Sequence, residues 1–271
     1  MELKKAKRHK AYLKLGVSAV SGGGKSMSAL LLAKGLVGDW EKIAVIDTEN
    51  GSANLYEHLG NYNVLELKTF SPNDYIKAID VCLQAGMKCI IIDGISFEWD
   101  WCLAYQTKLG GKYQDWGQVT PLHDAFKNKI LQSPVHVITT VRRKQEYEIV
   151  TEGGKTKVNK VGLAEQTRGG YEYELTLNFE IDENHLARAS KDRTGLFVDK
   201  IPFKITEETG IELRNWANAP SNNEEELQKA LVEVTNSDSL ETLKKVFANY
   251  TEFHENESFK SACTNKKQQF S

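Results

Sequence analysis

The stretch Ala19-Val20-Ser21-Gly22-Gly23-Gly24-Lys25-Ser26 matches the phosphate-binding pattern G-x-x-x-x-G-K-[S/T], except that Ala19 replaces the first glycine. Residues 12–20 before it alternate and are β-prone, and residues 27–36 (MSALLLAKGL) have an apolar helical pattern. A strand, a glycine loop and a helix in this order point backbone N–H groups and a helix N-terminus at a phosphate. We therefore predict a nucleotide-binding loop, which tolerates Ala19 if its φ angle is negative.

The pattern also assigns the contacts to the nucleotide. Lys25 is expected to reach the β- and γ-phosphates, and the Ser26 hydroxyl is expected to bind Mg²⁺. The predicted nucleotide-binding residues are Ser21, Gly22, Gly23, Gly24, Lys25, Ser26 and Met27.

An acidic residue follows the second predicted strand. Residues 42–47 (KIAVID) are typical of a buried parallel strand, and Glu49 lies two residues beyond its end. A carboxylate there is placed to orient and deprotonate an attacking water, so we interpret Glu49 as the catalytic base. Dinucleotide folds place a ribose-binding acid at a similar point, but they need G-x-G-x-x-G after the first strand. A plain surface acid is the other remaining interpretation.

Two further strands end in polar residues. Residues 88–93 (KCIIID) place Asp93 after four apolar positions, which predicts that Asp93 holds Mg²⁺ together with Ser26, directly or through water. Residues 135–141 (VHVITTV) place Thr139 and Thr140 near a strand end, where a hydroxyl can sense the γ-phosphate. Buried threonines also pack well in sheets, so both interpretations of Thr140 stay open.

Composition limits the class of protein. The 271 residues, with 40% hydrophobic and 27% charged side chains, suffice for an α/β core with a small appendage. The net charge of −2 does not exclude nucleic-acid binding, which can depend on a local patch. No apolar run approaches a membrane span and residues 1–10 lack the core of a signal peptide, so we expect a cytosolic protein without a membrane partner. The cysteines show no zinc spacing and are interpreted as reduced thiols: Cys82, Cys89, Cys102 and Cys263.

The predicted domain organisation has four parts. These are a basic N-terminal tail (1–10), a core (11–216), a linker (217–223, ANAPSNN) and a C-terminal helical module (224–271) of two or three helices. Within the core we expect further strands at 64–68, 171–181 and 185–190. We also expect helices at 71–85 and at 96–132, the latter interrupted by a loop at 110–112, and a closing hairpin of 201–205 with 211–213 around Thr209-Gly210.

Three segments resemble the ATPase core of RecA-like recombinases: residues 46–51 (IDTENG), 90–96 (IIIDGIS) and 137–144 (VITTVRRK). The resemblance implies an α/β fold with a RecA-like P-loop NTPase core, in which helices flank a mostly parallel central sheet. It also implies ATP as the nucleotide and Glu49 as the catalytic base. The Asn-Gln pair that precedes the mobile DNA-binding loop in that family is replaced here by Thr139-Thr140.

The chain is most similar to small phage-encoded RecA-like ATPases, a group of phage nucleotide-binding proteins that includes single-strand-annealing recombinases. Residues 14–26, 43–56 and 190–197 carry this resemblance, which covers about residues 10–215. It implies a phage- or prophage-encoded protein in the bacterial cytoplasm that hydrolyses ATP with Mg²⁺, binds single-stranded DNA and promotes recombination or strand annealing.

In the RecA-like family the strand that ends in Asn-Gln leads into a mobile DNA-binding loop, and residues 139–142 (TTVR) are the matching run in this sequence. The corresponding segment here, residues 142–170, is a glycine-containing basic stretch with room for a hairpin, and such a loop can follow a single-strand backbone. The predicted DNA contacts are Arg142, Arg143, Lys144, Lys155, Lys157, Lys160 and Arg168. Residues 108–113 (KLGGKY) are a second candidate, and a solvated loop is the alternative for both.

Residues 191–195 (KDRTG) are similar to the family's segment that reaches the ATP of a neighbouring subunit. The resemblance implies that Lys191 and Arg193 act in trans on the γ-phosphate and that the chain forms a homo-oligomer, either a ring or a filament. A charged turn between two strands is the alternative.

Other functions use the same loop. A small-molecule phosphotransferase would need an acceptor pocket and a lid, and would turn over as a monomer. In a nucleotide-gated assembly module, ATP would drive assembly and hydrolysis would be incidental. A helicase or packaging motor is less compatible with the short chain.

Overall fold

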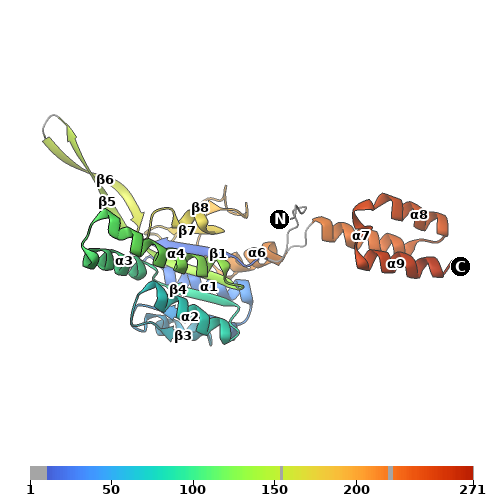
Figure 1. The fold of residues 1–271 in the computed structure, drawn as a ribbon, viewed down its shortest axis with the longest axis horizontal. Coiled ribbons are helices and arrows are strands. Elements are labelled where there is room, and N and C mark those ends of the chain that lie inside the picture. The colour runs from blue at the N-terminus through green and yellow to red at the C-terminus, as the bar shows by residue number, and fades with distance from the viewer. Residues whose placement is uncertain (1–10, 153–154, 219–221, 271) are drawn as a thin grey trace. The chain divides into compact units, whose positions relative to one another are not determined.

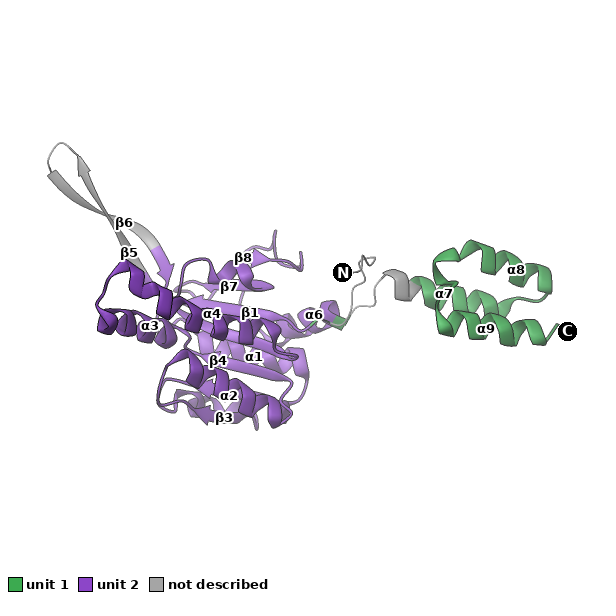
Figure 2. Ribbon diagram, viewed as in Figure 1, with its two compact units in different colours: residues 1–11, 218–271 green, residues 12–217 purple. Residues whose placement is uncertain are grey.

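The computed structural model describes residues 11–152, 155–218 and 222–270. The chain divides into two compact units, residues 12–217 and residues 218–271 with 1–11 (Figure 2). The predicted basic tail at 1–10 lies outside the described residues.

A mostly parallel sheet forms the centre of the larger unit (Figure 1). In the described residues the strand order is β3-β2-β4-β5-β1-β7-β8, and β6 pairs with β5 alone. Only the β5–β6 and β7–β8 pairs among them are antiparallel. The strands are β1 (Lys14–Ala19), β2 (Ile43–Asp47), β3 (Asn63–Glu66), β4 (Cys89–Asp93), β5 (His136–Glu152), β6 (Lys155–Glu165), β7 (Leu177–Ile181) and β8 (Ala187–Asp192).

Helices cover both faces of this sheet. Residues that alternate along β2, β4 and β5 share one buried cluster with α2 and α4, where the Tyr75 and Phe126 rings lie 5.0 Å apart. The intervening residues of the strands point to the opposite face, where α1 contacts β4 and β5. The helices of this unit are α1 (Lys25–Val37), α2 (Pro72–Gln84), α3 (Ser96–Leu109), α4 (Trp116–Gln132), α5 (Tyr171–Glu174) and α6 (Glu207–Asn218), with short 3₁₀ turns η1 (Trp40–Lys42), η2 (Ser52–Leu59) and η3 (Tyr113–Asp115).

This architecture confirms the predicted α/β fold class: a mostly parallel sheet flanked by helices, with the phosphate-loop sequence between its first strand and first helix. The helix predicted from residue 71 begins where expected, because the Ser71 side chain accepts a hydrogen bond from the Asp74 N–H and Pro72 occupies the first turn.

The predicted closing hairpin at 201–213 is wrong. Residues 211–213 lie inside α6, and Phe203 makes only an isolated bridge to Ala187. Gly210, which the sequence suggested as a turn residue, instead allows close helix packing. A Cβ added to Gly210 would lie 2.4 Å from the Leu32 carbonyl oxygen of α1, and one added to Gly35 would lie 2.6 Å from Gly210 Cα.

Two other segments differ from the sequence interpretation. The strand expected from residue 171 begins only at Leu177, because residues 171–174 form the short helix α5. The basic segment after residue 142 contains the hairpin for which the sequence left room, but it is strand where a long loop was expected. β5 continues to Glu152 and pairs with β6 in antiparallel orientation, with a register shift between Glu146 and Tyr147.

The C-terminal unit is a small helical bundle, as the periodicity of residues 224–271 predicts. Its elements are α7 (Asn222–Asn236), α8 (Leu240–Asn249), η4 (Thr251–Phe253) and α9 (Glu257–Gln268). The buried cluster of this unit includes Ala230, Leu243 and Phe259. Ser239 caps α8, accepting a hydrogen bond from the Thr242 N–H. The segment expected as a linker at 217–223 overlaps the ends of α6 and α7, and residues 219–221 lie outside the described part.

Candidate nucleotide site

The phosphate loop joins the end of β1 to the start of α1. Gly22 and Gly24 have φ angles of 77° and 84°, which side chains with a Cβ rarely adopt. Ala19 keeps a negative φ, as its place in the motif requires. Its methyl group lies close under the loop, since a Cβ on Gly23 would come within 2.7 Å of the Ala19 Cβ. The loop therefore accommodates Ala19 by keeping glycine at position 23.

Lys25 is a buried ammonium next to this loop. It is 9% exposed, and its Nζ donates a 3.1 Å hydrogen bond to the Val20 carbonyl. No ion pair joins it to a carboxylate in the part of the chain that the structure describes. Burial lowers the pKa of Lys25, while Glu49 and Asp93 favour its charged form. A buried cation without a carboxylate partner, beside loop glycines at a helix N-terminus, fits a phosphate group.

The strand register places the metal candidates together. Asp47 lies opposite Asp93, Asp93 lies opposite Thr140, and Thr140 lies opposite Val17, so β2, β4, β5 and β1 present these positions at one level. The Ser26 hydroxyl donates to Asp93 Oδ2 at 2.7 Å, and the Thr140 hydroxyl donates to Asp93 Oδ1 at 2.8 Å.

Asp93 is 2% exposed, and burial raises its pKa against the opposing hydrogen bonds from Ser26 and Thr140. A buried carboxylate that contacts the loop hydroxyl fits the donor set that Mg²⁺ uses beside a nucleotide. The Thr140 hydroxyl is engaged with Asp93, and Thr139 donates to the Leu15 carbonyl at 3.2 Å. A contact of Thr140 with the γ-phosphate stays a prediction.

Glu49 lies on the turn after β2, and the preceding aspartate shapes that turn. Asp47 accepts hydrogen bonds from the Glu49 N–H at 2.7 Å and from the Ala53 N–H at 3.0 Å. The Glu49 carboxylate itself pairs with Arg142, which lies opposite Ala19 in the β1–β5 register. Arg142 Nη2 and Nε donate to Glu49 Oε1 at 2.7 and 3.2 Å, and the guanidinium carbon lies 4.3 Å from the Phe97 ring centroid.

This pairing changes the expected role of Arg142. The sequence placed Arg142 among the DNA contacts, whereas in the structure its side chain spans from the candidate base to Phe97. No pattern in the sequence indicates this pair, because 93 positions separate the two residues and only the parallel register of β2, β4 and β5 brings them together.

His185 is a second residue that the sequence interpretation missed. It lies in the β7–β8 turn with φ 61°, and a Cβ on Gly24 would come within 3.3 Å of its Nδ1. Asp182 holds the turn by accepting hydrogen bonds from the Asn184 and Leu186 N–H groups. The imidazole therefore lies beside the phosphate loop of its own chain.

Lys191 and Arg193 lie at the other end of the sheet. Asp192 pairs with Leu177, and Leu177 pairs with Leu15, so the C-terminal end of β8 is level with the start of β1. The phosphate loop follows the opposite end of β1. Lys191 Nζ and Arg193 Nη2 both donate to the Tyr173 carbonyl, at 2.7 and 2.9 Å. The structure does not bring these two cations to the phosphate loop of the same chain.

The predicted DNA contacts fall into three groups. Arg142, Arg143 and Arg168 form ion pairs with Glu49, Glu180 and Asp124. Lys144 is exposed at the base of the hairpin. Lys155, Lys157 and Lys160 belong to β6, but their side chains lie outside the described ones. In the second candidate, between α3 and η3, Tyr113 is 92% exposed beside Lys112.

Comparisons with known proteins place the chain in a family. A family model described as an AAA domain matches residues 11–207, which is more than half of the chain. No curated protein matches. Among solved structures, a KaiC-like protein from the hyperthermophilic archaeon Pyrococcus horikoshii OT3 is similar at a TM-score of 0.43 and 15% identity, over 72% of this chain and 86% of that one, which is too weak to carry further inference.

Within the described residues, no helix is long and apolar enough to span a membrane. The family match, together with the phosphate loop, Lys25 and the Ser26–Asp93 contact, supports one conclusion about identity. The chain belongs to the AAA domain family and contains a P-loop ATPase core.

Proposed function

We propose that this protein is a Mg²⁺-dependent ATPase that binds single-stranded DNA and promotes recombination or annealing of phage DNA in the cytoplasm of a bacterial host. One observation carries the ATPase part of the proposal. The register of β1, β2, β4 and β5 gathers the phosphate loop, Asp93 and the turn that carries Glu49 at one edge of the sheet. The carboxyl ends of parallel strands are where such folds bind their ligands.

Each residue has a distinct role in this scheme. The loop N–H groups and Lys25 bind the β- and γ-phosphates of ATP, with Ser21, Gly22, Gly23, Gly24, Ser26 and Met27 completing the contacts. Ser26 and Asp93 hold the metal, which when bound neutralises phosphate charge. Glu49 orients the attacking water and accepts its proton. Met27 is the third residue of α1, so its backbone N–H belongs to the first turn at the N-terminus of the helix.

DNA binding is assigned to the β5–β6 hairpin and to the turn between α3 and η3. The hairpin continues the strand that carries Thr140 and Arg142, so it is covalently continuous with the nucleotide site. Lys144 offers a cation for the phosphate backbone, and the exposed Tyr113 offers a ring on which a base can stack.

The proposed oligomer follows from the position of the trans-acting cations. Lys191 and Arg193 lie at the end of the sheet remote from their own phosphate loop, so the nucleotide that we assign to them is that of another chain. A head-to-tail contact of that kind closes into a ring or continues as a filament.

A direct test measures ATP hydrolysis and ATP binding by wild type and Glu49→Gln, with Glu57→Gln as the matched control because Glu57 is an exposed acid of the same region. Loss of the base should lower turnover by about 10²–10⁴-fold while ATP binding persists. Wild-type turnover that survives in Glu49→Gln would remove Glu49 from the role of base.

One contact favours a second candidate function, a nucleotide-gated assembly module. Arg142 occupies the Glu49 carboxylate in this structure, which leaves the base less available to a water molecule. In such a module ATP binding drives assembly on DNA, so Glu49→Gln would retain ATP-dependent DNA binding and strand annealing in full. In the leading proposal the same variant binds DNA but does not dissociate from it, because dissociation requires ATP hydrolysis.

A further inference from the structure

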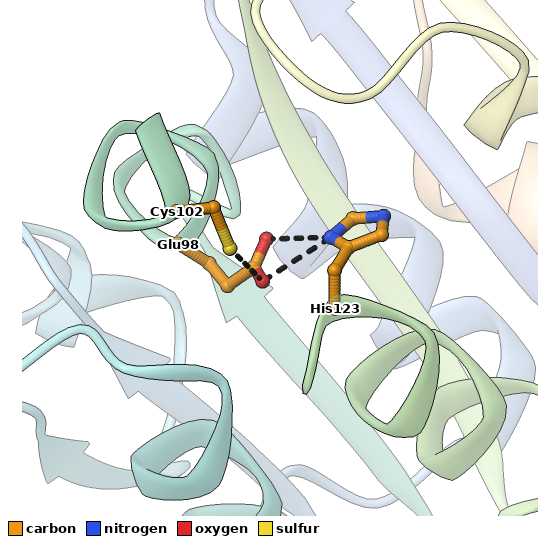
Figure 3. A group of neighbouring side chains, drawn as sticks. All are labelled: Glu98, Cys102 and His123. Carbon is orange, nitrogen blue, oxygen red and sulfur yellow. Dashed lines mark hydrogen bonds and ion pairs between the residues drawn. The ribbon is translucent and has the colours of Figure 1, made fainter. Parts of the chain in front are cut away.

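A buried group of metal-binding side chains lies between α3 and α4, apart from the nucleotide site. Glu98 and Cys102 come from successive turns of α3, and His123 comes from α4 (Figure 3). Their candidate ligand atoms all lie within 4.8 Å of one another. The three side chains are 0–2% exposed, so each is removed from solvent.

The three groups point at a common centre. Cys102 Sγ donates to Glu98 Oε1 at 3.1 Å, and His123 Nδ1 lies 3.2 Å from the same oxygen and 3.1 Å from Oε2. Tetrahedral coordination of zinc, with bonds of about 2.0–2.3 Å, separates neighbouring ligand atoms by about 3.5 Å. The separations of 3.1–3.2 Å from the Glu98 oxygens to Cys102 Sγ and His123 Nδ1 therefore need only a small expansion to admit the ion, and no two of the ligand atoms are more than 4.8 Å apart.

We infer that Glu98, Cys102 and His123 form a zinc site that fastens α3 to α4. The donor set selects the metal: a thiolate, an imidazole and a carboxylate suit Zn²⁺, whereas Mg²⁺ takes oxygen ligands. When Zn²⁺ binds, the thiol proton of Cys102 passes to solvent and a zinc–sulfur bond forms. The thiolate and the carboxylate then balance the two positive charges of the ion, so the buried site is neutral overall.

The surroundings suit a retained ion. The Trp99 ring packs edge-on against His123 at 5.4 Å and stacks on Trp116 at 5.6 Å, which shields the cluster on one side. His123 also lines a polar cavity of about 430 Å³ with Arg168 and Tyr171, which provides an entry path. No sequence motif indicates this site, because Cys102 belongs to no metal-binding spacing and its two partners come from different helices.

The test measures metal content and cobalt uptake of the full chain. Wild type purified with Zn²⁺ and excess Mg²⁺, without nucleotide, should retain about one zinc per chain after desalting. After chelation, Co²⁺ should restore one equivalent and give a thiolate-to-cobalt charge-transfer band in the near ultraviolet. Cys102→Ser and Glu98→Gln should lower the retained zinc at least tenfold, whereas Cys82→Ser, at another buried cysteine, should retain it.

The cobalt spectrum of wild type keeps the proposal falsifiable if a variant fails to fold. Absence of the charge-transfer band in folded wild type, or its persistence in Cys102→Ser, would overturn the zinc site. Either result would leave the cluster as a buried hydrogen-bond network. The ATPase proposal does not depend on the outcome, since the nucleotide site uses none of these three residues.

Discussion

The Arg142 guanidinium makes two hydrogen bonds, of 2.7 and 3.2 Å, to a single carboxylate oxygen of Glu49. Glu49 is the candidate base of the nucleotide site, and Arg142 begins the part of β5 that continues into the hairpin. The Ser96 hydroxyl also accepts a 3.0 Å hydrogen bond from the Arg142 N–H. The pair thus joins the candidate hydrolytic residue to the segment assigned to DNA, and a carboxylate oxygen that accepts two hydrogen bonds from a guanidinium is less accessible to a water molecule.

Replacing Arg142 should therefore change how hydrolysis depends on DNA. In Arg142→Ala, DNA-free turnover should rise about 10-fold because Glu49 is released, and added single-stranded DNA should stimulate little further. Arg142→Lys should give an intermediate rate, since lysine keeps the charge without the two-donor geometry. Arg188→Ala, which removes an exposed pair with Glu180, is the matched control. A fall in DNA-free turnover would instead mean that Arg142 positions Glu49 for catalysis.

The buried Asp93 carboxylate is expected to lower the free energy of unfolding while it serves metal binding. Burial raises its pKa, so between pH 3.8 and that raised pKa the native state binds more protons than the unfolded state, and stability decreases as pH rises through this interval. Asp93→Asn should therefore raise the free energy of unfolding at pH 7 by about 1–2 kcal/mol and abolish Mg²⁺-dependent hydrolysis. Denaturant unfolding without nucleotide checks this, with the exposed Asp100→Asn as control. A destabilised Asp93→Asn protein would contradict the assignment of a desolvation cost to this carboxylate.

The buried Lys14 should make the free energy of unfolding depend on pH in the alkaline range. Its ammonium donates to the Ser133 and Val135 carbonyls, and burial lowers the pKa of Lys14 to about 8 from 10.5. Between those values the native state binds fewer protons than the unfolded state, so stability should rise with pH by up to about 3 kcal/mol. Denaturant unfolding from pH 7 to 10 measures this. In Lys14→Met the free energy of unfolding should no longer rise with pH, whereas in the exposed Lys42→Met it should still rise. If Lys14→Met shows the same pH dependence as wild type, the lowered pKa of Lys14 is not its cause.

The proposed action of Lys191 and Arg193 on another chain's nucleotide predicts that two inactive variants regain ATP hydrolysis when they are mixed. A Lys25→Ala chain lacks a working loop, and a chain with Lys191→Ala and Arg193→Ala lacks the cations. Each should be nearly inactive alone, but a 1:1 mixture should recover about a quarter of wild-type turnover, because some contacts join an intact loop to intact cations. Mixing two samples of the same variant is the control. A mixture no more active than its components would leave these residues as a charged turn.

The fold could be predicted from local patterns. The strand and helix around Ala19–Ser26, the apolar runs ending in Asp47 and Asp93, and the periodicity of the C-terminal residues all follow from sequence spacing. The wrong hairpin at 201–213 shows where such patterns fail. Gly210 looked like a turn residue, but its absent side chain serves a tertiary contact with Gly35 in α1, which no local pattern reports.

The candidate site could be predicted only where a motif supplied the residues. Lys25, Ser26, Asp93 and Glu49 end strands or follow the loop pattern, and the structure gathers them as expected. His185 and the Glu49–Arg142 pair depend on strand order and register, which one sequence does not reveal. Sequence patterns likewise do not indicate the group formed by Glu98, Cys102 and His123, because its members share no motif and only the fold brings them together.

The most direct test of the proposed function is the rate of ATP hydrolysis by wild type with and without single-stranded DNA over a series of salt concentrations. Glu49→Gln measured in parallel gives the background. We expect single-stranded DNA to stimulate ATP hydrolysis at low salt, and this stimulation should fall steeply as the salt concentration rises, because cation–phosphate contacts release counterions. Hydrolysis that depends on Glu49 but is unaffected by single-stranded DNA at every salt concentration would contradict it.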